Sequence, residues 1–139
     1  MNPNVPQEVI DAFNSYTPGL PYHEAGTTTV AVIGDGLINN TYKVTCELKT
    51  NFLLQKINTQ VFKNPAKVQH NCNYLSTYAE MEFTGIRIPY IIEFAKEQSL
   101  YKDKNGDFWR AFEFVEDGYS ISIAQNPQQA KATAICFAK

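Results

Sequence analysis

The sequence predicts an α+β fold: a five-stranded, mostly antiparallel sheet with a helix packed on it and a further helix at each end of the chain. Two observations predict this class. Three β-rich segments follow one another through short connections, and a segment with helical apolar spacing separates them from a final hairpin. The 139 residues are 44% hydrophobic and 13% aromatic, which suits one domain with a packed core. We therefore expect a single domain over residues 1–139.

The first half of the chain is expected to hold one helix and three strands. Apolar residues within 5–13 recur at helical spacing and predict a short amphipathic helix. Strands are predicted for 27–33, 42–46 and 52–57, which are rich in β-branched or aromatic residues or alternate apolar with polar positions. The segment 47–51 is expected to connect the last two of these strands as a hairpin.

A second helix is predicted over 65–80. Asn64 is a good N-cap residue, and a proline at the next position suits the first turn of a helix. Four residues recur at helical spacing and predict one buried stripe. They are Val68, Cys72, Leu75 and Ala79.

The remaining segments predict a hairpin and a terminal helix. Residues 86–100 are apolar and β-prone, the Asn105-Gly106 step favours a hairpin turn, and 108–115 reads as the return strand. Asn126, Pro127 and Gln129 then match the pattern of a helix start with reciprocal capping. The helix that follows is apolar up to the last residue. We therefore expect that the chain continues in a longer protein, or that this helix forms a homodimer or another partner interface.

Composition and charge exclude several classes. A net charge of −2 gives no electrostatic basis for binding nucleic acid. The sequence shows neither a signal peptide nor an apolar run of the roughly 20 residues that would span a bilayer, so a cytoplasmic location and no membrane contact are expected. Three scattered cysteines favour reduced thiols, and two separated histidines have no zinc-ligand spacing, so no metal site built by this chain is predicted.

The segment Gly34-Asp35-Gly36 allows three interpretations. A dinucleotide-binding loop must lead directly into a helix, but the residues after Asn40 favour a strand. A Walker P-loop needs Gly-Lys-Ser/Thr and a helix, and neither follows. A glycine-rich connection that closes a hairpin over phosphates, as in protein kinases, fits the predicted strand–loop–strand order. A plain polar turn remains open beside it.

A kinase-type loop requires a basic residue on the third strand and a carboxylate on the next helix. Lys56 lies at a suitable distance along the chain, although a solvated lysine at a strand end explains it equally well. The helix has no aspartate or glutamate between Lys67 and Tyr78. His70 and Asn71 occupy that region instead.

Three phrases of the sequence together resemble the aminoglycoside phosphotransferase-like superfamily, and within it the N-acetylhexosamine kinase group. They span 34–44, 54–68 and 103–115, and the resemblance covers about residues 25–137. The phrase Gln55-Lys56-Ile57-Asn58-Thr59, followed by Val61-Phe62-Lys63-Asn64-Pro65, is its most specific part.

The resemblance implies the N-terminal lobe of an ATP-dependent kinase, with a set of nucleotide-binding residues. The connection from Gly34 to Asn40 would cover the phosphates, and either Gln55 or Lys56 would take the position of the basic residue. Asn71 would face that position from the helix in place of a glutamate. The other implied contacts are Asp35, Gly36, Asn39 and Thr41 near the loop and Phe114, Val115 and Glu116 at a hinge beside adenine. Trp109 and Arg110 also belong to the shared phrases, and we interpret both as structural. Trp109 would serve core or interface packing, and Arg110 would form a surface or interlobe ion pair.

The resemblance also implies what this chain lacks. In kinase-like folds the groups that orient the acceptor hydroxyl and bind Mg²⁺ come from a larger C-terminal lobe, and no motif of that kind occurs here. We therefore expect no catalytic residue in this chain, which would bind ATP with Mg²⁺ and act on a sugar, such as an N-acetylhexosamine, only together with its own C-terminal lobe. The alternative is a stand-alone, non-catalytic binding module that reuses this lobe's fold.

Overall fold

The computed structural model describes residues 5–18, 24, 26–34, 38–47, 50–82, 88–118 and 123–138. These residues form three helices and one open sheet of six strands. The helices are α1 (Gln7–Tyr16), α2 (Pro65–Glu82) and α3 (Pro127–Ala138). The strands are β1 (Thr28–Val32), β2 (Asn40–Cys46), β3 (Phe52–Lys56), β4 (Ile91–Ile92), β5 (Tyr101–Lys102) and β6 (Phe108–Glu113). The predicted α+β class is confirmed, whereas the expected five strands are six.

The strand order is β1-β2-β3-β6-β4, with β5 also paired to β6, and every pairing is antiparallel. Consecutive strands β1 to β3 are neighbours, as expected for hairpins. After α2 the chain forms β4 at the other edge of the sheet, and β6 later returns between β4 and β3. The register places Thr41 opposite Gln55, and Gln55 opposite Arg110. These three side chains therefore point to the same face of the sheet.

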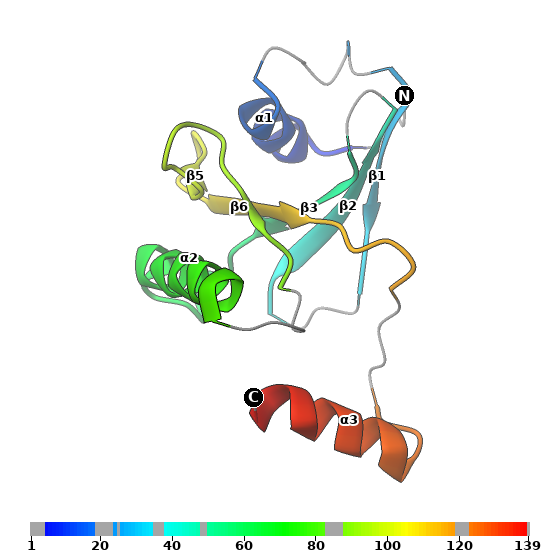
Figure 1. Cartoon of the computed structure of the whole chain (residues 1–139). Coiled ribbons are helices and arrows are strands. Elements are labelled where there is room, and N and C mark those ends of the chain that lie inside the picture. The colour runs from blue at the N-terminus through cyan, green and yellow to red at the C-terminus, as the bar shows by residue number, and fades with distance from the viewer. Residues whose placement is uncertain are drawn as a thin grey trace.

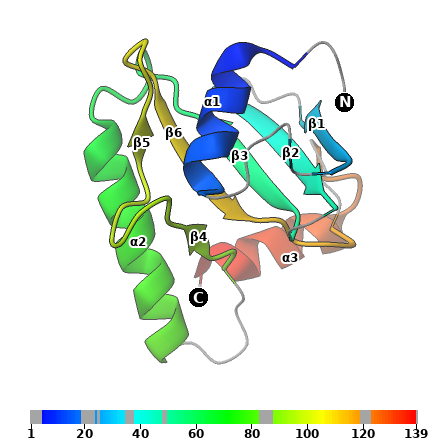
Figure 2. The same cartoon turned by 90° about the horizontal axis from the view of Figure 1, so that it is seen from above.

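The apolar core lies between α1 and one face of the sheet. Figure 1 shows α1 crossing this face, and Figure 2 shows it above the central strands. Alternate residues of β2, β3 and β6 point toward the helix, which is why buried positions recur at every second residue. The core consists of Val9, Ala12, Phe13, Tyr16, Tyr42, Val44, Cys46, Phe52, Leu54, Trp109 and Ala111. The Tyr16 hydroxyl ties α1 to the sheet, since it lies 2.8 Å from the carbonyl oxygens of both Ser99 and Trp109.

α2 lies along the opposite face, near β6 (Figure 1), and its contacts there are largely polar. Gln69 is almost fully buried and donates to Asn73 and Ser99, and Cys72 contacts Arg110. Ala79 is buried as predicted, but the prediction for Leu75 was wrong, because that side chain is 56% exposed. The side of α2 that meets the sheet thus carries amide and thiol groups where an apolar stripe was expected.

Local signals placed the starts of α2 and α3 correctly, whereas α1 begins two residues later than predicted and extends to Tyr16. Asn64 Oδ1 accepts a hydrogen bond from the Lys67 amide at 3.0 Å, which is the N-cap geometry. Asn126 Oδ1 likewise accepts from the Gln129 amide at 2.9 Å, and the Gln129 side chain accepts from the amide before the cap. α3 stands apart from the sheet (Figure 1), and its residues 130–135 are exposed. The expected dimer through this helix stays a prediction.

The hairpin turn before β6 is built around one buried carboxylate. Asp103 Oδ1 accepts from the backbone amides of Asn105 and Asp107 at 2.8 and 3.0 Å, and Oδ2 accepts from Trp109 Nε1 at 2.8 Å. Burial would raise the pKa of Asp103, but these hydrogen bonds outweigh burial and lower it. Gly106 has a φ of 87°, which explains the Asn-Gly signal at this turn.

Several predicted strand boundaries differ from the structure. The strands β1, β2 and β3 differ from the predicted ranges by one or two residues at an end. The apolar segment 86–100 gives only the two-residue β4, because a turn follows in which Glu97 has a φ of 59° and Ala95 pairs with Gln98. β6 ends at Glu113, before the predicted end at Val115. No helix of the described residues is long and apolar enough to cross a bilayer.

Candidate functional site

One face of the sheet is left incompletely covered. We call it the open face, defined by Thr41, Lys43, Leu53, Gln55, Arg110 and Phe112. Each of these side chains is half-buried, whereas the residues between them along each strand are buried against α1. This face thus combines polar, cationic and apolar groups and stays partly accessible to solvent.

A ladder of hydrogen bonds crosses three strands of this face. Gln55 Nε2 donates to Thr41 Oγ1 at 2.8 Å, and Arg110 Nε donates to Gln55 Oε1 at 2.9 Å. Arg110 Nη1 also lies 3.3 Å from Cys72 Sγ on α2, and its guanidinium lies 5.0 Å from the Phe112 ring centroid. The ladder therefore runs from Thr41 on β2, just after the glycine-containing connection, to Cys72 on α2.

Arg110 was expected to form a surface or interlobe ion pair. It forms no ion pair within the described part of the chain, and a pair with another lobe stays a prediction. Its partners among the described residues are an amide oxygen, a thiol and an aromatic ring, and none is a carboxylate. The companion prediction for Trp109 is confirmed, because its side chain is fully buried in the core.

Lys43 is the second cation of the open face. Its ammonium lies 3.7 Å from the centroid of the Phe114 ring and 3.8 Å from Glu116 Oε2. Glu116 also accepts a 2.6 Å hydrogen bond from the Asn51 side chain. The predicted hinge residues thus lie directly after β6, with Phe114 and Glu116 held by β2 and the β2–β3 connection, and with Val115 40% exposed.

Lys56 points to the α1 side of the sheet, away from the open face. Its ammonium lies 3.0 Å from Glu8 Oε2 and 2.7 Å from Asp107 Oδ2, and 5.7 Å from the Trp109 ring centroid. Burial would lower the pKa of Lys56, but the two carboxylates outweigh it and raise the pKa. Lys56 is therefore neutralised between α1 and the β5–β6 turn, where it joins these two elements.

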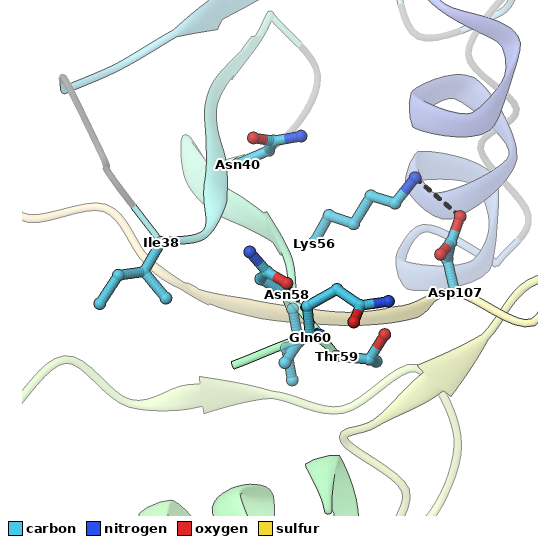
Figure 3. A pocket seen from close by; sticks show the side chains of 8 residues that line it. Ile38, Asn40, Lys56, Asn58, Thr59, Gln60 and Asp107 are labelled. Carbon is cyan, nitrogen blue, oxygen red and sulfur yellow. Dashed lines mark hydrogen bonds and ion pairs between the residues drawn. The ribbon is translucent and has the colours of Figure 1, made fainter. Parts of the chain in front are cut away.

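A polar hollow of about 290 Å³ lies beside Lys56 at the ends of β2 and β3. Figure 3 shows Lys56 extending toward Asp107, with the side chains of Asn40, Asn58, Thr59 and Gln60 around the hollow. Asn40 thus faces this hollow and is exposed at the start of β2.

The glycine-containing connection is anchored at both ends. Gly34 has a φ of 73°, which an L side chain rarely adopts, so this position requires glycine. The Ile33 amide donates to the Thr41 carbonyl at 3.0 Å, and Asn39 Oδ1 accepts from the Asn58 amide at 2.9 Å. Asp35 and Gly36 lie outside the described residues. Asn39 therefore ties the end of the connection to the chain that leaves β3.

The structure selects Gln55 over Lys56 as the residue of β3 on the open face, but it does not bring Asn71 to it. Asn71 is exposed, and Cys72 is the α2 residue that joins the hydrogen-bond ladder through Arg110. Sequence reasoning missed Arg110 and Lys43 as open-face cations. The available signal was their alternation with the buried residues Trp109 and Val44 along two strands.

No protein-family model matches this sequence. No group of three or more His, Cys, Asp or Glu side chains that could hold a metal ion occurs among the residues that the structure covers.

Proposed function

We propose that this chain is the nucleotide-binding N-terminal lobe of a cytoplasmic, ATP-dependent small-molecule kinase that acts on a sugar such as an N-acetylhexosamine. One observation carries the proposal: a half-exposed, cation-bearing sheet face lies beside an anchored, glycine-containing strand–strand connection. In this arrangement the connection covers the phosphates and the sheet face receives the nucleotide.

The order of elements supports the proposal. The chain runs from β1 through the connection to β2, then to β3, α2 and the final hairpin, which is the order that a kinase-type phosphate site requires. The apolar core lies entirely on the α1 side, so ligand binding at the open face need not disrupt it.

The open face offers complementary groups for a nucleotide. Leu53 and Phe112 supply apolar surface for a base, while Lys43 and Arg110 give the face positive charge that attracts an anionic nucleotide. The residues of this chain bind and orient the nucleotide. Groups that position the acceptor hydroxyl and hold Mg²⁺ would come from a C-terminal lobe, so this chain alone catalyses no transfer.

Two measurements test the proposal. The first is a calorimetric titration of this chain with ATP and Mg²⁺, and the second is a phosphorylation screen of the full-length gene product over amino sugars. We expect weak but saturable ATP binding by the chain and sugar phosphorylation only by the longer protein. Absence of ATP binding would refute the nucleotide site, and failure on every amino sugar would refute the substrate alone.

A further inference from the structure

We propose that Arg110 is the cation that binds the phosphate chain of the nucleotide, and that Gln55 orients it without neutralising it. This inference rests on the proposed nucleotide-binding function and specifies its phosphate site. It moves the positive charge from β3, where a kinase-type lysine lies, to the neighbouring strand β6.

The three cations near the connection differ in how far their charge is compensated. Lys56 lies on the other face between two carboxylates at 2.7 and 3.0 Å. Lys43 has a carboxylate at 3.8 Å and an aromatic ring against its ammonium. Arg110 has no ion-pair partner among the described residues. A half-buried guanidinium without a counter-ion attracts anions most strongly of the three, because no neighbouring charge offsets it.

The donors of Arg110 are arranged for a further acceptor. Nε–H donates to Gln55 and one Nη1–H points to the Cys72 sulfur, so two of the five N–H groups are used. The remaining Nη hydrogens form the planar fork that binds phosphate oxygens in pairs. Triphosphate chains present several such oxygens in sequence.

Gln55 holds the guanidinium in place through an amide with a defined orientation. Arg110 Nε can only donate, so Gln55 must present Oε1 to it and Nε2 to Thr41. Thr41 lies on β2 just after the glycine-containing connection and is paired in register with Gln55 of β3. The ladder therefore sets the position of Arg110 relative to the segment that would cover the phosphates. A glutamate at position 55 would make the same contact but would neutralise the charge.

The test compares the affinities of ATP and AMP for the wild-type chain and three variants, by calorimetric titration. Arg110→Gln removes the charge, and Gln55→Glu compensates it while adding an ion pair that favours folding. Lys102→Gln removes one positive charge from an exposed site and serves as the matched control. The ratio of AMP to ATP dissociation constants isolates binding to the outer phosphates.

We expect wild type to prefer ATP over AMP by at least about tenfold, the value of one charge-assisted contact. Arg110→Gln and Gln55→Glu should both reduce this preference to near one, with AMP affinity nearly unchanged, and Lys102→Gln should retain it. An unchanged preference in both variants would overturn the role of Arg110 but leave the proposed function intact. Should Arg110→Gln fail to fold, Gln55→Glu decides alone. Absence of ATP binding by wild type would overturn both proposals.

Discussion

Replacing Asp103 by asparagine should destabilise the fold far more than its near-isosteric size suggests. The carboxylate accepts two backbone amides on Oδ1 and the buried indole N–H of Trp109 on Oδ2. An asparagine has only one acceptor oxygen. If that oxygen keeps the two backbone amides of the turn, its Nδ2 group faces the indole N–H, and two donors meet. If the side chain is turned round, Nδ2 faces the two backbone amides instead. One charge-assisted bond is lost and a buried N–H is left unpaired, so we expect a loss of about 2–4 kcal/mol in the free energy of unfolding.

Urea unfolding can measure this loss, because Trp109 is the only tryptophan in the chain and its fluorescence reports directly on the core. Far-UV circular dichroism provides a second probe of the same transition. Asp11→Asn makes the same chemical change at an ion pair with an exposed lysine and should cost less than about 1 kcal/mol. Equal losses in the two variants, or a loss below about 0.5 kcal/mol for Asp103→Asn, would refute this account of the turn.

Three further predictions concern the packing of the core, the dependence of stability on acidic pH and the ion pairs of Lys56. Phe13→Ala leaves a cavity at a fully buried site and should lower the free energy of unfolding, measured in urea, by about 3–5 kcal/mol. A loss below about 1 kcal/mol would show that the packing of α1 on the sheet does not stabilise the core. Because the pKa of Asp103 is lowered in the folded state, its stabilisation is complete above the unfolded pKa of about 4 and is lost as the pH falls through the folded value. The stability gap between wild type and Asp103→Asn should therefore narrow in acid, and a gap independent of pH would contradict the assignment. Lys56→Gln should lower the free energy of unfolding by about 1 kcal/mol at low salt and by less at high salt, because it removes two ion pairs. In a double-mutant cycle, the loss caused by Lys56→Gln should be smaller when Glu8 is already replaced by glutamine. A loss that does not change with salt would show that Lys56 stabilises the fold through packing instead.

The features that the sequence predicted well are those with local causes. Asn64 and Asn126 are recognisable as caps because their side chains bond to amides only three residues away. The strands β2 and β3 follow from alternation, which depends on one residue and its neighbours. The class of the fold and the order of elements follow from these local signals.

The misplaced features depend on partners that are distant in sequence. Alternation shows that Gln55 and Lys56 face opposite sides of the sheet, but which side receives α1 depends on the packing of a helix about forty positions earlier in the chain. Leu75 was expected to be buried because it is apolar. Instead, α2 presents Gln69 and Cys72 to the rest of the fold, where Gln69 bonds to Ser99 and Cys72 contacts Arg110. Arg110 could not be recognised as an uncompensated charge until its neighbours on β3 and α2 were known.

The two halves of the core are synthesised far apart in time, and this affects how the nascent chain folds. Tyr16 of α1 bonds to Trp109 of β6, 93 positions later in the chain. At ribosomal speeds of about 5–20 residues per second, α1 waits on the order of 5–20 s before its last partner strand is synthesised. During that interval the apolar side of α1 and the first three strands have no complete core to join. Newly made chains should therefore depend on chaperones that shield this helix, and rare codons between α1 and β6 should lengthen the exposure and lower the yield of folded protein.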